Sequence, residues 1–466
     1  MRDILLTLTI FGSVPLILVK PHIGVLVFSW ISYMNPHRLT WGFAYNFHFA
    51  FLIAATTILA WAISREPKRL PWNGVTLLLI AFSLWVSFTT LFALYPDEAY
   101  IKWERTAKIL LFNGFITLAL MGSKERLNAL VWVIVLSIGF FGAKGGLFTL
   151  LGGGTARVFG PAGSFIQDNN DLGLALVTVI PLMRYLQLAS PHRTVRWGLG
   201  GLIALSFVAI LGTYSRGAIV GAAVLVVALV LKSRRRVMMV AGIAVVLVLG
   251  IGLMPQYWHT RMGTIASEEV DASVQGRLDA WGYAIDLALE RPITGGGFRA
   301  VEGYVNPNSG VARSAHSIYF EVLGEHGFVG LALYLALGIG TFFTGSWILR
   351  HAKGDPDLVW ARDLASMLQV SLTAFAVAGL FLGLAFFDLF YHLVVIMILT
   401  GAVVKEALST AARQESGRKP AVNEASESET QDSTPRGSKL GRLVRVGAIH
   451  HRVSSRDGTA GETGDS

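Results

Sequence analysis

The chain has 466 residues, of which 53% are hydrophobic and 15% are charged, and its formal net charge is +9. The charged fraction lies far below the roughly 25% of soluble domains, which excludes an ordinary soluble protein and predicts a polytopic membrane protein. The absence of cysteine excludes disulfides, thiolate catalysis and cysteine-ligated metals. The positive charge requires no nucleic-acid partner, because membrane proteins concentrate Lys and Arg in their cytoplasmic loops.

Apolar runs separated by charged residues succeed one another up to residue 404. They predict an all-α polytopic membrane protein with 12 or 13 transmembrane helices, since the first two runs can be two short helices or one span broken at Lys20 and Pro21. The runs are 4–19, 24–33, 47–63, 75–94, 109–121, 127–151, 172–186, 199–212, 218–231, 237–254, 317–349, 364–386 and 389–404.

The charged connections predict the orientation of these helices. Basic residues gather on alternate connections, which the positive-inside rule assigns to the cytoplasm. The intervening connections, among them the long polar segment 255–315, are then external, in the periplasm. Residues 405–466 are rich in Ser, Glu, Pro and Gly, so we expect a disordered cytoplasmic tail after a transmembrane domain at 1–404. The basic connections are 65–70, 123–126, 191–196, 232–236 and 350–353, and the external ones include 96–105, 152–171 and 213–217.

Two arginines on the predicted external side are candidate binding residues for an anion. Arg216 lies in a tight turn beside the hydroxyls of Tyr214 and Ser215; it can bind substrate, or it can reach the lipid headgroups. Arg277 lies in the first turn of a predicted amphipathic helix that ends at Pro292. A cation is unfavourable at a helix N-terminus, which favours an external anion there over a solvated surface charge.

The same polar segment carries three further candidates. Arg299 adds another guanidinium, the group best suited to phosphate oxygens. The glycine run that ends at Gly297 either lets backbone N–H groups approach a phosphate or forms a flexible turn. His316 lies where the chain re-enters the membrane, and it can act as a general base or simply line a helix start.

Other polar residues near these candidates give weaker signals. Asn170 belongs to an Asp-Asn-Asn-Asp segment that either caps a helix or binds a sugar. Glu325 is nine residues beyond His316, so it cannot orient that histidine from the same helix face, and Glu325-His326-Gly327 can mark a break in an overlong helix. We expect Asp388 in a short external turn. No His, Asp or Glu set has the spacing of a metal site, so no metal is predicted.

Four segments in this order resemble the O-antigen ligase and polymerase superfamily, and in particular the O-glycosylation ligases associated with the exosortase A system. They are SRG at 215–217, GRLDAW at 276–281, RPITGGGF at 291–298 and AHSIYFEVLGEHG at 315–327. The resemblance extends from the first span to about residue 404. It implies a GT-C-like helical fold at the bacterial inner membrane and transfer of a glycan from undecaprenyl diphosphate to an acceptor hydroxyl at the periplasmic face.

The resemblance also implies roles for individual residues. Arg216 and Arg277 bind the diphosphate and His316 activates the acceptor, without metal or other cofactor, in an inverting transfer. The acceptor is an exported protein, a lipid or a glycan. Alternatives are an O-antigen or exopolysaccharide polymerase, a transporter or flippase, and a non-catalytic partner of the exosortase system. Substrate contacts are expected from Arg299, Asn170, Tyr214, Ser215, Gly297 and Glu325.

Overall fold

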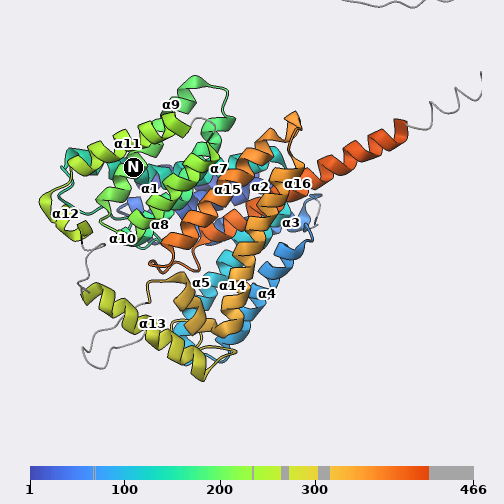
Figure 1. The fold of residues 1–466 in the computed structure, drawn as a ribbon. Coiled ribbons are helices and arrows are strands. Elements are labelled where there is room, and N and C mark those ends of the chain that lie inside the picture. Colours follow the sequence, from blue (N-terminus) through green and yellow to red (C-terminus); the bar gives the residue numbers. More distant parts are fainter. Residues whose placement is uncertain (67, 69, 234–235, 264–271, 303–314, 419–466) are drawn as a thin grey trace, which may run out of the picture. The chain divides into compact units, whose positions relative to one another are not determined.

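The computed structural model describes residues 1–66, 68, 70–233, 236–263, 272–302 and 315–418, and every regular element within them is a helix. The predicted all-α polytopic membrane fold is confirmed (Figure 1). Within the described residues six helices are long and apolar enough to cross a membrane. They are α1 (Arg2–Val19), α7 (Lys124–Leu151), α8 (Asn169–Ala189), α9 (Arg193–Gly212), α14 (Ile318–His351) and α16 (Asp388–Arg418, with the apolar part in Asp388–Gln414).

The remaining predicted spans are helices that are shorter or carry more polar residues, so the total of 12 or 13 spans stays a prediction. The two N-terminal runs form separate helices, α1 and α2. A bend of 113° separates α11 from the short helix α12. These further helices are α2 (His22–Met34), α3 (Phe49–Ile63), α4 (Gly74–Thr90), α6 (Thr117–Leu120), α10 (Arg216–Lys232), α11 (Arg236–Gly252), α12 (Gln256–Gly263) and α15 (Val359–Ala378).

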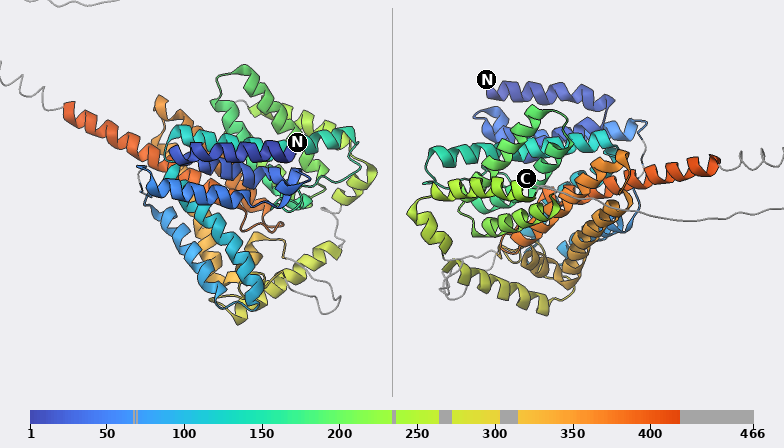
Figure 2. Two further views of the ribbon diagram at one scale, coloured as in Figure 1. Left: turned by 180° about the vertical axis from the view of Figure 1, so that it is seen from behind. Right: turned by 45° about the horizontal axis from the view of Figure 1, so that its top comes forward.

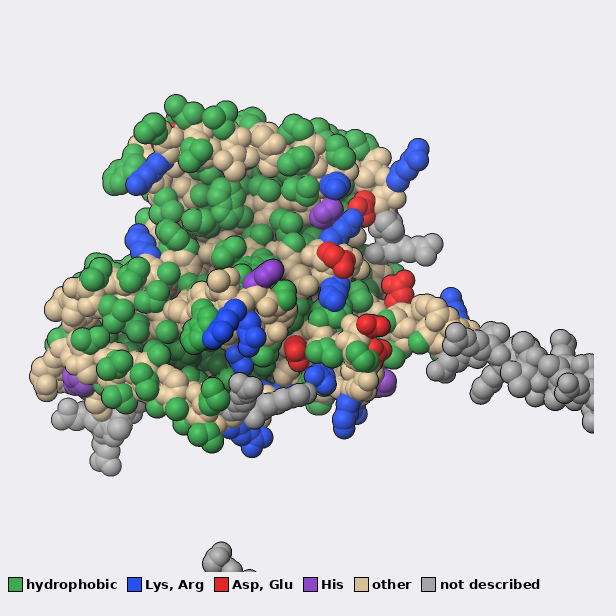
Figure 3. Space-filling view, turned by 90° about the horizontal axis from the view of Figure 1, so that it is seen from above, with side chains coloured by type: hydrophobic (Ala, Val, Ile, Leu, Met, Phe, Trp, Pro, Cys, Tyr) green, Lys and Arg blue, Asp and Glu red, His purple; other side chains and the backbone are tan. Residues whose placement is uncertain are grey.

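Helix α8 forms the centre of the packing, whereas α1 lies at its edge (Figure 2). In their apolar windows 78% of α8 is buried, against 17% of α1. Helix α8 contacts α7, α9, α10 and α15. Hydrophobic side chains cover most of the face seen in Figure 3, as expected of a surface in contact with lipid tails.

The structure corrects the prediction of a loop at 96–105. Residues Pro96–Ile109 form α5, which continues as the π-helix η3 (Leu110–Ile116). The sequence carries a typical helix start here, with proline at the first position, Asp97 and Glu98 in the first turn and Lys108 in the last.

Two other boundaries differ from the prediction. Helix α16 continues from residue 404 to Arg418, so part of the expected tail is helical, and residues 419–466 lie outside the described part. Asp388 is not part of the turn in which it was expected: it is the first residue of α16, is 1% exposed, and accepts a hydrogen bond from the Ser32 hydroxyl.

The predicted break in α14 is confirmed. Gly327 has a φ of 69° within the helix, which is the left-handed conformation that glycine adopts without strain. Helix α13 (Ala272–Glu290) packs against α14, and the amphipathic helix expected before Pro292 is therefore confirmed. It begins earlier than predicted, so Arg277 lies in its second turn, and the argument from an unfavourable cation at the helix N-terminus no longer applies.

Three segments predicted to be external contact one another. In the turn 213–217 the Tyr214 hydroxyl donates to Gly154 O of the connection 152–168, and the Tyr214 ring stacks on that of Tyr257 of α12, with centroids 5.6 Å apart. Elsewhere Arg126 pairs with Glu66 at 2.6 Å, which joins two of the predicted cytoplasmic connections. Both groupings agree with the predicted alternation of sides. Of the long segment 255–315, residues 264–271 and 303–314 lie outside the described part.

Candidate functional site

Arg216 is the first residue of α10 and is half-buried. The turn before it is fixed by its two hydroxyl residues. Tyr214 has a φ of 58°, is 1% exposed, and donates its hydroxyl to the carbonyl of Gly154. The Ser215 hydroxyl caps α10 by accepting the N–H of Ala218 at 3.3 Å. Both side chains hold the turn, so in this structure their part in the site is to position Arg216; their predicted contact with substrate stays a prediction.

The segment around Asn170 caps α8, as one of the two interpretations predicted. Asp168 accepts the backbone N–H of Asn170 at 2.8 Å and its side-chain amide at 2.9 Å. Buried Asn169 donates to Thr213 O over 2.7 Å, which joins the start of α8 to the turn that carries Arg216. The Asn170 amide is therefore engaged locally, and its contact with a sugar stays a prediction.

His316 precedes α14 and is exposed. Its φ of 43° is left-handed. The chain on either side of it is held by hydrogen bonds: the Trp281 indole donates to Ala315 O at 2.7 Å, and the N–H of Ile318 donates to Gly379 O at 2.9 Å. A strained backbone that its surroundings fix in this way is typical of functional sites.

Charged residues on α13 and at the start of α8 act on His316. Displacement of water by the surrounding protein lowers the pKa of His316, the positive charge of Arg277 lowers it further, and the carboxylate of Asp168 opposes both effects. Arg277 on α13 and Asp168 at the start of α8 thus lie close enough to act on the imidazole. The lowered pKa favours the neutral form, which is the form that accepts a proton.

The connection 379–387 between α15 and α16 contacts both the Arg216 turn and His316. A Cβ placed on Gly217 would meet Phe381 at 3.0 Å, and one placed on Gly383 would meet the His316 Cα at 3.4 Å. The structure therefore brings the Arg216 turn and His316 to the same loop, and the charge of Arg277 acts on His316. We call Arg216, Arg277 and His316 the arginine–histidine group.

The glycine run does not offer its N–H groups to a phosphate. The N–H of Gly296 donates to Gly324 O at 2.9 Å, and that of Gly297 donates to Glu325 O at 2.8 Å. A Cβ on Gly297 would lie 2.3 Å from the Ala93 Cβ, so glycine is required by close packing beside the break in α14. The predicted binding role of Gly297, which depended on a free N–H, is not supported by this geometry.

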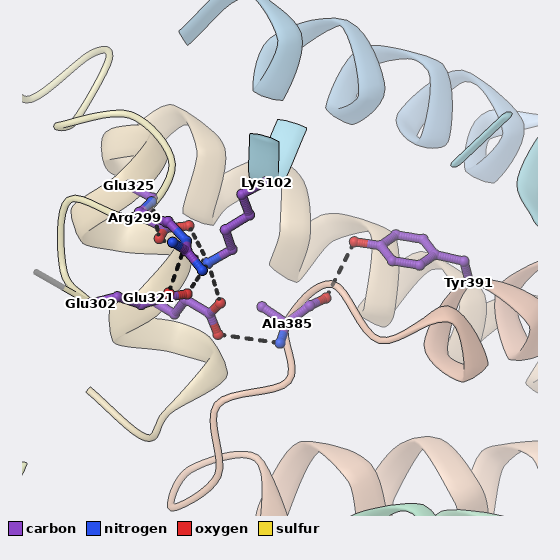
Figure 4. Close-up of polar contacts among 7 residues, drawn as sticks. All are labelled: Lys102, Arg299, Glu302, Glu321, Glu325, Ala385 and Tyr391. Carbon is purple, nitrogen blue, oxygen red and sulfur yellow. Dashed lines mark hydrogen bonds and ion pairs between the residues drawn. The ribbon is translucent and has the colours of Figure 1, made fainter. Parts of the chain in front are cut away.

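A cluster of four charged residues lies beside the contact between the glycine run and α14 (Figure 4). The Lys102 ammonium of α5 lies 2.6 Å from Glu302, 2.9 Å from Glu321 and 2.9 Å from Glu325. Burial alone would lower the pKa of Lys102, but the three carboxylates outweigh burial and raise it well above its ordinary value. Burial raises the pKa of Glu302, and Lys102 and Arg299 outweigh this effect and lower it. We call these four residues the Lys102 cluster.

The Lys102 cluster also holds Arg299. The N–H of Arg299 donates to Glu325 Oε1 at 2.7 Å, and its Nε lies 3.4 Å from Glu302 Oε2. Arg299 has a left-handed φ of 65°, and its side chain is 44% exposed. The Glu325 side chain is 0% exposed and bonded within the protein, so the substrate contact predicted for Glu325 is not one that this structure offers.

Within the described residues, Glu302, Glu321 and Glu325 form the one group of acidic or histidine side chains whose ligand atoms, within 4.8 Å of one another, could hold a metal ion. Their spacing along the chain did not reveal this group, since Glu302 comes from a separate segment. The Lys102 ammonium contacts all three carboxylates and supplies a positive charge there.

A cavity of about 310 Å³ opens beside the Lys102 cluster. Its charged lining consists of three cations, Lys102, Arg105 and Arg299, and three acids, Asp171, Glu302 and Glu321. The rest is mostly aromatic and aliphatic, with two hydroxyl residues, and comes chiefly from α5 and the connections 152–168 and 379–387. The other lining residues are Ile101, Thr106, Ser164, Phe165, Gly383, Leu384, Phe386 and Phe387.

Lys102, Arg105, Glu302 and Glu321 were not among the predicted site residues. One signal was present in the sequence. Glu321 and Glu325 stand four residues apart on one helix face, where like charges repel unless a cation lies between them. The identity of that cation could not be inferred, because Lys102 comes from a segment more than two hundred residues earlier in the chain.

Two family models match the chain. Residues 1–190 match a family of unknown function, and residues 201–335 match the family described as O-antigen ligase. The second match contains Arg216, Arg277 and His316, and it supports the resemblance to the O-antigen ligase superfamily. No curated protein matches the chain.

Proposed function

We propose that the protein is a glycan ligase of the bacterial inner membrane, related to the O-glycosylation ligases of the exosortase A system. It transfers a glycan from undecaprenyl diphosphate to an acceptor hydroxyl at the periplasmic face. The match to an O-antigen ligase family supports glycan transfer in O-antigen or polysaccharide synthesis. The observation that carries the proposal is that the Arg216 turn and His316 contact one loop while the charge of Arg277 acts on His316, with all three residues inside the matched segment.

His316 acts as the general base of the reaction. Its neutral imidazole accepts the proton of the acceptor hydroxyl while the acceptor oxygen bonds to the anomeric carbon of the glycan. The bond between that carbon and the diphosphate oxygen breaks at the same centre, so the configuration inverts. The exposure of His316 and its lowered pKa both favour this role, because the base must be reachable and unprotonated.

Arg216 and Arg277 bind the departing diphosphate. Negative charge grows on the leaving group in the transition state, and fixed guanidinium groups stabilise it better than water can. Their planar forks match phosphate oxygens in pairs. The arginines thereby supply the charge that a metal ion supplies in other transferases, so the GT-C-type transfer proceeds without metal.

The test is transfer from a lipid-linked glycan by purified protein in liposomes. His316→Ala should lower kcat by about 10² to 10⁴, the usual contribution of a general base. Donor binding should persist, and activity of the wild type should survive a chelator. His259→Ala is the matched control, since His259 is an exposed histidine of the same polar segment, on α12, and should retain full activity. Wild-type turnover by His316→Ala would reject the role.

Mass spectrometry of exported glycoproteins from a deletion strain identifies the acceptor class. Loss of glycan from proteins, with free polymer retained, supports the ligase. Loss of long chains everywhere supports the alternative polymerase, whose acceptor is another lipid-linked glycan. Unchanged glycoproteins and unchanged polymers would contradict both.

A further inference from the structure

The cavity beside the Lys102 cluster is built from three parts of the chain. Lys102, Arg105 and Asp171 come from the segment that matches a family of unknown function, and Glu321 comes from the segment that matches the O-antigen ligase family. The connection 379–387 closes it and lies outside both matches. None of the arginine–histidine group lines the cavity, so its chemistry is separate from the roles proposed above.

Two charged groups face the cavity without a hydrogen-bond partner among the described residues. Asp171 lies in the first turn of α8 and is half-buried. Arg105 is stacked on the ring of Phe165, with its guanidinium carbon 3.4 Å from the ring centroid. The stack orients the guanidinium and covers its face, which leaves its N–H edge to bond a ligand.

The charges of the lining do not suit a diphosphate. Its three cations and three acids have formal charges that cancel, and Lys102 already contacts the carboxylates of Glu302 and Glu321. A multiply charged anion would also lie against the carboxylates of Glu302 and Glu321, which line the cavity. A neutral group with many hydroxyls is different, because each hydroxyl can donate to a carboxylate and accept from a guanidinium.

The apolar part of the lining completes the match to a sugar. Phe165, Phe386 and Phe387 present hydrocarbon surface beside the charged groups. Pockets that bind small polar molecules combine such surface with a few converging hydrogen-bonding groups, in volumes of about 300 to 1,000 Å³. The cavity of about 310 Å³ falls at the lower end, which suits a short piece of glycan rather than a long one.

The cavity also shares a wall with the proposed base. Gly383 lines the cavity, and a Cβ on it would lie 3.4 Å from the His316 Cα and 3.6 Å from Glu321 Oε2. We propose that this cavity binds a hydroxyl-rich sugar unit at the reacting end of the donor or the acceptor, with Asp171 and Arg105 as its hydrogen-bonding contacts. The proposal rests on the glycan-transfer function proposed above.

The experiment compares two carriers bound to the full-length protein in nanodiscs. One is sugar-free undecaprenyl diphosphate, and the other is the same carrier bearing the glycan extracted from the source organism. Asp171→Asn and, separately, Arg105→Met should weaken binding of the glycan-bearing carrier roughly 10-fold to 100-fold, the range for a lost hydrogen bond to a charged group. Binding of the sugar-free carrier should not change. Asp97→Asn, an exposed acid in the first turn of α5, is the matched control.

A second readout separates the two sources of sugar. If donor binding is unchanged but KM for the acceptor rises by a similar factor at constant kcat, the cavity holds the acceptor sugar, and the proposal stands. Equal weakening of both carriers would make the cavity a phosphate site and overturn the proposal. So would wild-type donor and acceptor constants in both variants. If the wild type binds neither carrier, the proposed function itself fails, and this proposal fails with it.

Discussion

The arginine–histidine group and the Lys102 cluster place charge in two different ways. His316 is exposed and Arg216 is half-buried at a helix start, whereas the Lys102 side chain is 15% exposed and that of Glu325 is 0% exposed. The first group leaves charge where an incoming ligand can meet it. The second pairs its charges within the protein, in contacts of 2.6 to 2.9 Å. Exposure, more than charge itself, therefore separates the candidate reactive groups from the positioning ones.

The two groups are nevertheless connected through the backbone. Lys102 forms ion pairs with Glu321 and Glu325 in the N-terminal part of α14. His316 lies two residues before the first residue of that helix. Glu321 also accepts a weak hydrogen bond from Ala385 N at 3.4 Å, in the loop that contacts His316 (Figure 4). These ion pairs therefore hold the N-terminal part of α14 and the loop 379–387, which position His316. A precise reaction geometry requires such fixed supports.

The largest expected effect comes from breaking the internal cluster. Lys102→Met should lower the free energy of unfolding by about 3 to 5 kcal/mol, because it leaves three clustered carboxylates without their cation. Lys108→Met is the matched control on the same helix. Its exposed pair with Glu104 should contribute about 0.5 kcal/mol or less. Denaturant unfolding in detergent, followed by circular dichroism, measures both.

The double variant Lys102→Met with Glu325→Gln sharpens this test. Removing one of the carboxylates should recover part of the lost stability, since fewer like charges remain together. Equal unfolding midpoints for Lys102→Met and Lys108→Met would show that the carboxylates need no cation, and the comparison between internal and exposed charge would fail.

The sequence predicts this fold well wherever one segment determines the outcome. The run from 127 to 151 predicts α7, and the Glu325-His326-Gly327 motif predicts the break in α14, because apolar length and glycine act locally. Boundaries are predicted less well: the helix that carries Arg277 begins at Ala272, several residues before the expected start.

The site could be predicted only in part. Arg216 is predicted because a cation on the external side departs from the charge rule, and His316 because it lies where the chain re-enters the membrane. Arg277 is predicted from a helix start that the structure places several residues earlier. The Lys102 cluster could not be predicted, because Lys102, Glu302 and Glu321 lie on segments that only tertiary packing brings together. The hydrogen bond of the Gly297 N–H could not be predicted for the same reason, because its partner, Glu325 O, lies on another element.

The arginines of the arginine–histidine group give the next largest effect. Arg216→Lys and Arg277→Lys should each lower kcat by about 10² to 10³, because a point charge cannot replace the paired donors of a guanidinium in the transition state. Arg193→Lys is the control for the first variant, since Arg193 is likewise the first residue of its helix but lies in a predicted cytoplasmic connection. Steady-state transfer assays at equal protein levels measure the effect. Full activity in both lysine variants would remove the diphosphate role.

The smallest effect is a shift in the pH dependence of kcat/KM. It tests whether the charges around His316 act on its imidazole. Displacement of water by the surrounding protein and the charge of Arg277 lower the pKa of His316, so the acidic limb of log kcat/KM should lie below the ordinary histidine value of about 6.5. Asp168 opposes that lowering, and Asp168→Asn should therefore move the limb to still lower pH while leaving the α8 cap intact, because asparagine caps helices as well as aspartate does. Asp286→Asn, an exposed acid on the same helix as Arg277, should leave the limb in place. Profiles measured from about pH 5 to about pH 8 span the titration of a histidine. A limb that moves to higher pH in Asp168→Asn, or that persists unchanged in His316→Ala, would assign the titration to a different group and separate His316 from the charges around it.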